Sequence, residues 1–329
     1  MNYNAKIIGS GWYAPSQVVT NQYFNDLLGE DVDTWLCEKV QICERRWCAP
    51  DESTADLAEA AVSNAIKDAG LAPDDIDLLI IATDTPEFIS PSTASVIQDR
   101  LGLHNAGTFD LNTACAGFVT ALDTGSKYIQ ADGQYRYVVV AGAYAMSKYL
   151  NLQDKKTVTL FADGAGAVVL GRSAPGTGMI GCKLMTQGQY NEWMGIYYGG
   201  TRHPVTEEAV AHQDQKLKFV KKIPPEINPE IWSSMLVELC DKHKIVLEDI
   251  DHFFFTQINI NSIFETMDRL RLPREKAATI MHHYGYTGSA CLPMAFGQWM
   301  ENKRIEEGDI VAFIGSGGGL AFGVSLYKM

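Results

Sequence analysis

The chain has 329 residues, a formal net charge of −13, 46% hydrophobic residues and 20% charged residues. An acidic surface repels phosphate backbones and anionic membranes, which argues against a nucleic-acid-binding or membrane-surface protein. The length predicts about two domains, without disulfides to hold them. The N-terminus lacks the pattern of a signal peptide, and no apolar stretch approaches the ~20 residues of a membrane span, so we expect a cytoplasmic protein.

Strand-like and helix-like segments alternate through the first half. Strands are expected at residues 6–10, 78–83, 108–111, 137–145 and 167–170. Helices are expected from Ser53, the predicted cap, to the stop at Gly70, then at residues 92–101 and 116–130. Continuous apolar runs such as LLIIAT are typical of strands buried on both faces.

The second half repeats this order. Helices are expected at residues 229–244, 262–270 and 289–302, and strands at 252–256, 278–281 and 309–314. Such alternation predicts a layered α/β architecture. Periodicity is weak between residues 172 and 225, so we divide the chain into a first half (1–173), an insertion (174–225) that lines or covers a site, and a second half (226–329).

Seven cysteines are scattered along the chain, and their odd number does not indicate a disulfide framework. Cys37, Cys43 and Cys48 cluster, but without the C-x-x-C pairs of common zinc sites. We therefore expect no metal site and interpret these three as buried small hydrophobic residues.

Cys115 lies where the predicted strand 108–111 leads into the predicted helix 116–130. Small residues surround the sulfur in TFDLNTACAGFVTAL, which would let a substrate carbonyl come close. The positive end of a helix dipole stabilises a thiolate, so the position predicts a lowered pKa. From spacing alone, a buried structural cysteine is the alternative to a nucleophile.

The segment GSGGG at residues 315–319 follows a predicted buried strand and precedes another apolar run. Consecutive glycines permit close backbone approach. One interpretation is a tight hairpin. The other is that the amide of Gly318 stabilises the oxyanion of an attacked thioester.

DLNTACAGFVTAL resembles the active-site segment of β-ketoacyl-acyl-carrier-protein synthase III, and WLCEKVQICERR, SPSTASVIQDRLGL, LFADGAGAVVLG and GSGGGLAFG agree with that family in order. The resemblance covers nearly the whole chain. It implies a thiolase-like fold, a duplicated αβαβα five-layer sandwich. It also implies a homodimer, no resident cofactor, and transfer of an acyl group from coenzyme A, as substrate, to Cys115.

Two positions depart from the family pattern. Thr256 stands where the family has the histidine of H-Q-A-N, and Tyr286 stands where it has the asparagine of G-N-T-S. In the family these two residues bind the malonyl thioester carbonyl and promote decarboxylation. Losing one such donor costs about 10²–10³ in rate, so we expect acyl loading on Cys115 to survive better than decarboxylation. Thr256 and Tyr286 could form a donor pair of their own, or His282 or His283 could substitute.

The resemblance also places coenzyme A at an entrance formed by Trp35, Lys39 and Lys155, with Asn259 matching the family's substrate-binding pattern. An indole can stack on adenine, and ammonium groups can pair with phosphates. The family's basic residue for docking acyl carrier protein is replaced by Asn261. Together with the acidic surface, this favours a free coenzyme A thioester over a carrier protein.

Three functions are compatible with this sequence. The first is Claisen condensation of an acyl group on Cys115 with a malonyl-type thioester. The second is transfer of that acyl group to oxygen, nitrogen or water without decarboxylation. The third is a partner subunit of reduced activity, against which the retained Cys115 argues.

Overall fold

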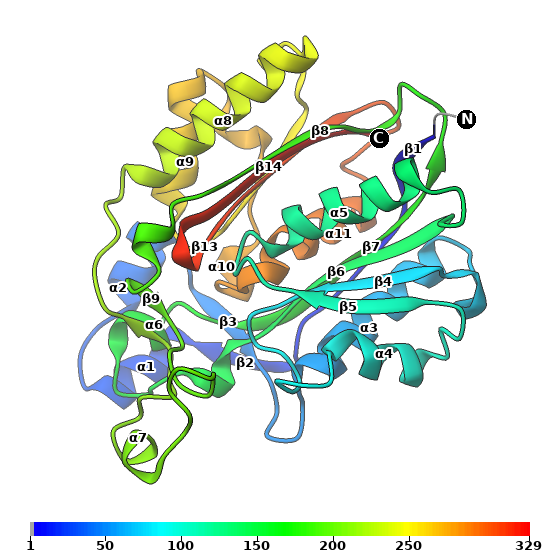
Figure 1. The fold of residues 1–329 in the computed structure, drawn as a ribbon. Coiled ribbons are helices and arrows are strands. Elements are labelled where there is room, and N and C mark those ends of the chain that lie inside the picture. Colours follow the sequence, from blue (N-terminus) through cyan, green and yellow to red (C-terminus); the bar gives the residue numbers. More distant parts are fainter. Residues whose placement is uncertain (1–2) are drawn as a thin grey trace.

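The structure, a computed structural model, describes residues 3–329, and these form two five-stranded sheets with the same internal order (Figure 1). The first sheet runs β1-β7-β6-β4-β5, and the second runs β8-β14-β13-β11-β12. In each sheet the first two pairs are antiparallel and the last two are parallel. Order and direction therefore repeat between the halves, although the amino acids do not.

The strands of the first sheet are β1 (Asn4–Tyr13), β4 (Leu78–Ala82), β5 (Gly107–Leu111), β6 (Tyr137–Ala145) and β7 (Asp163–Ser173). Those of the second are β8 (Gly178–Thr186), β11 (His252–Phe255), β12 (Ala277–Ala278), β13 (Ile310–Gly317) and β14 (Ala321–Lys328). The main helices are α3 (Thr54–Asp68), α4 (Thr93–Leu101), α5 (Gly117–Ala131), α8 (Ile227–His243), α9 (Ile260–Leu270) and α11 (Cys291–Glu301).

Helices and sheets alternate in five layers. Figure 1 shows α5 and α11 between the two sheets, α3 and α4 on the outer face of the first sheet, and α8 and α9 on the outer face of the second. This arrangement confirms the αβαβα sandwich expected from the sequence. Because α5 and α11 each contact both sheets, the N-termini of these two helices lie near the centre of the molecule.

The apolar run of β4 shows why the strands are hydrophobic on both faces. Leu79 and Ile81 pack with α3 and α4 in the outer core, whereas Leu78 and Ile80 pack in the central core with α5. Full burial of such a side chain stabilises the fold by roughly 1.5–3 kcal/mol. Ser53 caps α3 as predicted, and its backbone amide donates to Asp56 at 2.7 Å.

The segment predicted as an insertion contains an element of the second sheet. β8 lies within residues 174–225 and pairs with β14, so regular structure begins earlier than the weak periodicity indicated. β14 itself is formed by the apolar run that follows GSGGG. The division into 1–173, 174–225 and 226–329 remains a prediction about domains, but the repeated unit of the second half starts at Gly178.

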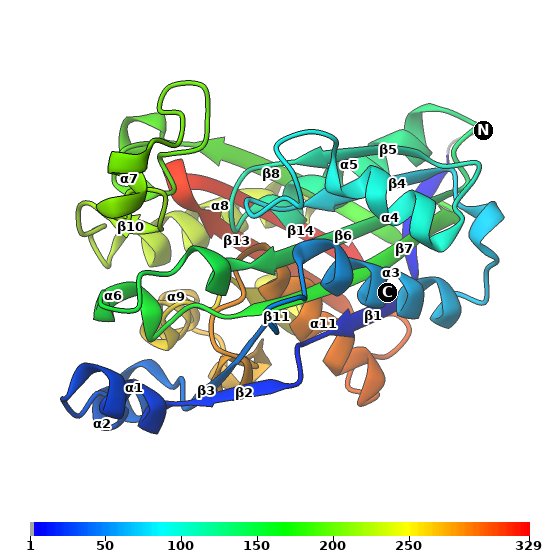
Figure 2. The same cartoon turned by 90° about the horizontal axis from the view of Figure 1, so that it is seen from below.

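Smaller elements gather at one end of the molecule (Figures 1 and 2). They are β2 (Gln17–Thr20), α1 (Asn21–Leu28), α2 (Asp33–Trp35), β3 (Glu44–Trp47), α6 (Lys155–Val158), β9 (Met194–Gly195), α7 (Glu207–Ala211) and β10 (Lys218–Phe219). The short helix α10 (Met281–Tyr284) packs against β3. None of the helices in the described part of the chain is long and apolar enough to cross a bilayer.

The interpretation of the clustered cysteines is wrong for two of the three. Cys37 and Cys43 are joined by a disulfide and are only half-buried. Only Cys48 is buried as expected. The odd number of cysteines concealed this pair because five others are free thiols.

Candidate active site

Three neighbouring parallel strands of the first sheet end at the same edge. β4 lies between β5 and β6, with Ala82 opposite Leu111 on one side and Gly142 on the other. The chain continues from β5 to Cys115, from β4 to Asp84, and β6 carries Tyr144 near its own end. The carboxyl ends of parallel strands are a common place for functional groups, since loops there converge.

These residues open onto one cavity of about 290 Å³. Cys115, Asp84 and Tyr144 line one side of the cavity, and Gly318 lines it from the end of the second sheet. Residues 191, 194–197 and 217 also line the cavity. The segment between the halves therefore lines the site, as the sequence analysis predicted.

Cys115 is placed as predicted, but its electrostatics are the reverse of the prediction. The side chain is 2% exposed, and burial raises the pKa of the thiol well above its ordinary value. The nearby Asp84 carboxylate raises this pKa further, and a hydrogen bond from the Tyr286 hydroxyl only partly offsets the rise. Desolvation outweighs the helix dipole here, because the sulfur lies in the protein interior rather than at an exposed helix end.

The backbone around Cys115 is held in an unusual conformation. Ala114 has φ of +47°, in the left-handed region that a residue with a Cβ adopts at a cost of about 1–3 kcal/mol. The Ala114 amide donates to the side chain of Asn112 at 2.9 Å. β13 packs directly on this bend: a Cβ added at Gly317 would lie 2.6 Å from the Cys115 nitrogen and 2.7 Å from the Thr113 oxygen.

We predict that Gly317→Ala destabilises the protein by about 1–3 kcal/mol, because the added methyl group must push the two backbone segments apart. The matched control is Gly188→Ala, where a Cβ meets nothing within 4 Å. Thermal unfolding followed by circular dichroism compares the two variants with the wild type. Equal midpoints for the two variants would contradict the close approach.

Tyr286 lies beside the Cys115 sulfur but, like Thr256, is not among the residues that line the cavity. Its hydroxyl hydrogen-bonds Cys115, and burial raises the pKa of the phenol well above its ordinary value. The Tyr286 backbone pairs with residues 160–162, through its amide to the Leu160 oxygen and its oxygen to the Ala162 amide, each at 2.9 Å. The phenol is thus a fixed, neutral donor beside the thiol.

Thr256 is less suited to the role expected for it. Its hydroxyl donates to the Ser316 carbonyl at 3.3 Å and accepts from the Ser316 amide at 3.0 Å. Among the described residues it is not part of the cavity lining. His282 and His283 are exposed and also lie outside that lining, and His283 is 3.4 Å from Glu44. The structure does not bring either imidazole to Cys115.

Comparisons with known proteins agree with this geometry. The family model for 3-oxoacyl-[acyl-carrier-protein] synthase III matches residues 109–188, and the model for its C-terminal part matches residues 240–329. The β-ketoacyl-[acyl-carrier-protein] synthase III of Staphylococcus haemolyticus is 35% identical, over 99% of both chains. That of Clostridium perfringens is 36% identical, also over 99% of both chains.

The chain belongs to the 3-oxoacyl-[acyl-carrier-protein] synthase III family. The crystal structure of synthase III from Thermus thermophilus matches with a TM-score of 0.90 and 30% identity, over 98% of this chain and 99% of that one. The priming β-ketosynthase of the R1128 polyketide pathway matches with a TM-score of 0.88 and 25% identity, over 100% of this chain and 97% of that one. The chain is accordingly an acyltransferase of the β-ketoacyl synthase III type.

None of the residues that the family resemblance places in coenzyme A or substrate binding is among those that line the cavity, although α6 packs against β10, which pairs with the cavity-lining strand β9. Trp35 ends α2 and is 53% exposed, and Asn259 caps α9. The neighbouring Asn261 donates to the Lys39 carbonyl at 2.8 Å, which ties α9 to the α2 region. Lys155 begins α6, and its ammonium lies 3.0 Å from Glu30. No other described residue near Lys155 forms an ion pair with it.

Asp84 is the residue of this synthase III site that the sequence analysis missed. It lies in TDTPEFISPS, directly after the buried run of β4. A polar residue at the end of a buried parallel strand, next to the strand that leads to Cys115, was the available signal. None of the motifs that carry the family resemblance gives a role to Asp84, so they did not point to it.

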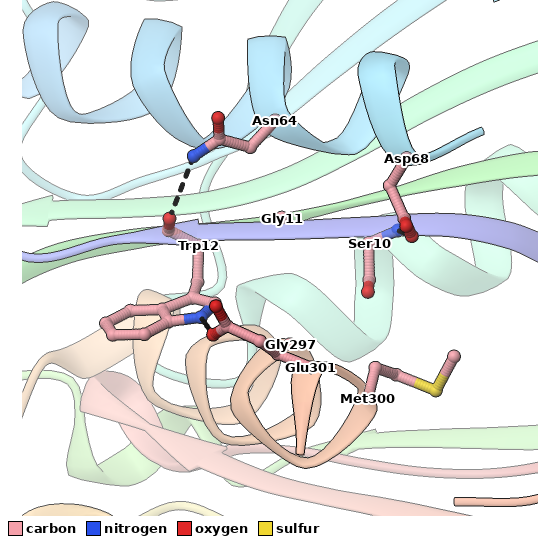
Figure 3. A pocket seen from close by; sticks show the side chains of 8 residues that line it. All are labelled: Ser10, Gly11, Trp12, Asn64, Asp68, Gly297, Met300 and Glu301. Carbon is pink, nitrogen blue, oxygen red and sulfur yellow. Dashed lines mark hydrogen bonds between the residues drawn. The ribbon is translucent and has the colours of Figure 1, made fainter. Parts of the chain in front are cut away.

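A second, larger hollow of about 440 Å³ lies between α3, β1 and α11, away from Cys115 (Figure 3). Its polar groups largely satisfy one another. The Trp12 indole donates to Glu301 at 2.9 Å, Asn64 donates to the Trp12 carbonyl at 3.3 Å, and Asp68 accepts from the Ser10 amide at 2.9 Å. These pairs connect the outer helix, the edge strand and the central helix, which is a structural role.

Proposed function

We propose that the chain takes an acyl group from a coenzyme A thioester onto Cys115 and transfers it to a malonyl-type thioester by Claisen condensation. The observation that carries this proposal is the Cys115 sulfur in a cavity where the ends of both sheets meet, with Tyr286 on the sulfur and Gly318 in the same wall. Acyl-coenzyme A is a substrate in this scheme, and the chemistry uses no resident cofactor.

The loading step needs an oxyanion site, since attack on the thioester carbonyl places a negative charge on its oxygen. Backbone amides at the Cys115 bend and at Gly318 are the proposed donors. In the second step the malonyl donor loses carbon dioxide, and the resulting enolate attacks the acyl carbon and releases Cys115. Tyr286 is the proposed donor to the enolate oxygen, with Thr256 as a second donor only if Ser316 releases its hydroxyl.

One observation favours a second function, transfer of the acyl group to oxygen, nitrogen or water without decarboxylation. Asp84 places a carboxylate in the cavity lining, where it repels the carboxylate of a malonyl donor. Thr256 already satisfies Ser316, which leaves fewer donors for an enolate. Retention of an accessible cavity at Cys115 supports either chemistry over a silent partner subunit.

We predict a mass increase on Cys115 when the purified protein is mixed with a panel of acyl-coenzyme A esters and measured by intact mass spectrometry. Cys115→Ala is the control and should show none. Carbon dioxide release on adding malonyl-coenzyme A supports condensation, whereas an adduct without release supports the second function. No adduct with any ester, in a protein with a native circular dichroism spectrum, would overturn both.

The proposed entrance for coenzyme A comprises Trp35, Lys39, Lys155 and Asn259. Support comes from the hydrogen bond of Asn261 to the Lys39 carbonyl, which holds the start of α9 against the Lys39 segment, and from the exposed Trp35 indole, which is available for stacking. Lys155 is partly neutralised by Glu30, so a phosphate must compete with this carboxylate for the ammonium. Coenzyme A affinity is therefore expected to depend on both members of the pair.

We predict that Glu30→Gln tightens coenzyme A binding by about two- to five-fold, as expected from an exposed ion pair of up to ~1 kcal/mol. Lys155→Met should weaken it. Glu59→Gln is the matched control, because it removes the same charge from an exposed pair with Arg100 on the outer helices. Isothermal titration calorimetry measures the affinity of the wild type and of the three variants for coenzyme A. Equal tightening by Glu30→Gln and Glu59→Gln would indicate a general charge effect and contradict the site.

We also propose that the protein is a cytoplasmic homodimer that uses coenzyme A thioesters in preference to a carrier protein. β5 is an edge strand of the first sheet, and the loop after Asp84 exposes Phe88 by 52% and Ile89 by 86%. An unpaired edge beside exposed apolar side chains is a surface that a second copy can cover. Asn261, at the position expected for carrier docking, is uncharged and bonded to Lys39.

Sedimentation velocity tests the dimer. Ile89→Asp is expected to shift the protein toward monomer, since it places a charge in the apolar contact. Val246→Asp provides the control, because Val246 is 55% exposed in the turn before β11, on the second half of the molecule. A monomeric wild type at micromolar concentration would contradict the proposal.

A further inference from the structure

Asp84 is the one charged residue among the described residues that line the Cys115 cavity. The family's catalytic positions do not account for it, and the proposed condensation does not use it. Its position is nevertheless well defined. The Thr85 amide donates to Thr83 at 3.1 Å, and the Ala145 amide donates to Thr85 at 2.9 Å, which fixes the end of β4 against the end of β6.

The carboxyl of Asp84 lacks the partners that a buried acid usually has. Its Oδ1 is buried and has no hydrogen-bond partner anywhere in residues 3–329. Burial raises the pKa of this carboxyl to about 6, and only its own backbone amide counteracts the rise. Buried unpaired carboxylates are costly, so one that persists in a cavity beside a nucleophile points to chemistry.

The groups that face Asp84 leave it as the available base. Its charge raises the pKa values of Cys115, Tyr144 and Tyr149, and no lysine, arginine or histidine of the described chain contributes to its own shift. Tyr144 and Tyr286 are buried phenols with pKa values well above the ordinary one, so they stay neutral and cannot act as bases. Burial also raises the pKa of Cys291, which acts on Cys115 and Tyr286, to about 12.

Cys115 needs such a base. Its thiol is protonated at neutral pH because burial and Asp84 both disfavour the thiolate. A protonated thiol is a poor nucleophile, and the helix end does not compensate for desolvation. The carboxylate that disfavours a free thiolate can assist attack by taking the proton as the new bond forms.

We propose that Asp84 is the general base for acyl loading, a role that rests on the proposed function. Asp84 acts on Cys115 through its charge, and no hydrogen bond joins the two side chains, so the proton must travel through one water molecule in the shared cavity. As the Cys115 sulfur attacks the thioester carbonyl, its proton passes by way of this water to Asp84 and the carbonyl electrons move to oxygen. When the intermediate collapses, the bond to the coenzyme A sulfur breaks and Asp84 returns the proton to that sulfur. The products are acyl-Cys115 and coenzyme A thiol, with Asp84 again ionised.

Alkylation of Cys115 by iodoacetamide between pH 5 and 9 tests the base without any acyl substrate. In the wild type the rate should rise through pH about 6, as Asp84 ionises, and then stay level to about pH 8. In Asp84→Asn the alkylation rate should increase about tenfold per pH unit, because the reaction then depends on the fraction of Cys115 thiolate alone. At pH 7 the rate of this variant should lie about 10²-fold below that of the wild type. Cys115→Ala corrects for labelling of other thiols.

Electrostatics alone predicts the opposite sign. If Asp84 only repels the thiolate, the Asp84→Asn substitution lowers the pKa of Cys115. The variant is then alkylated faster than the wild type at every pH, and the rates of both proteins rise with pH at the same slope. That result would overturn the proposal. Asp84→Glu keeps a carboxylate, so its alkylation rate should again become level above the carboxyl pKa. A level region in the rate profile of Asp84→Asn would also overturn the general-base proposal. Circular dichroism of each variant establishes that it is folded.

Acyl loading measured by intact mass on the same three proteins separates the two proposals. Loading by the wild type with a loss in Asp84→Asn and recovery in Asp84→Glu supports the base. If the wild type forms no acyl adduct on Cys115, the proposed function is contradicted. The pH profile of alkylation then still decides whether Asp84 takes the thiol proton. Equal loading rates in the wild type and Asp84→Asn would overturn the role in loading.

Discussion

The site depends on two places where a strand of one sheet touches the chain at the start of a central helix. A Cβ at Gly317 in β13 would lie 2.6 Å from the Cys115 nitrogen, ahead of α5, and a Cβ at Gly142 in β6 would lie 2.2 Å from the Ser289 oxygen, ahead of α11. The two contacts are equivalent in the duplicated fold, since β6 and β13 occupy the same place in their sheets. Backbone-to-backbone contact at both places brings Cys115 and Tyr286 together.

The charge of the cavity lining comes from a single side chain among the described residues, that of Asp84. The sequence motifs predict that Thr256 and Tyr286 stand where the family has an imidazole and an amide, and the Thr256 hydroxyl is occupied by Ser316. The remaining ionisable group at neutral pH is Asp84. A buried carboxylate beside Cys115, with the Thr256 hydroxyl already bonded, favours moving a proton over stabilising an enolate in the proposed chemistry.

The order of elements could be predicted from the sequence because buried parallel strands are continuous apolar runs with polar ends. The strand at Tyr137–Ala145 agrees residue for residue, and Cys115 lies at the predicted strand-to-helix junction. β8 was missed because an edge strand with one half-exposed face lacks a long apolar run. The pKa of Cys115 was predicted in the wrong direction because sequence shows where a helix begins but not how deeply its first residues are buried.

The buried carboxylate of Asp84 also couples proton binding to folding. Its pKa is about 6 in the folded chain, against about 3.9 for an exposed aspartate. Between these values the folded state retains a proton that the unfolded state releases, so the free energy of unfolding falls by up to about 3 kcal/mol as the pH rises from about 3.9 to about 6, and this loss stays constant above pH 6. At neutral pH the protein thus maintains a reactive anion in its interior at the expense of conformational stability, a trade-off common in enzyme centres.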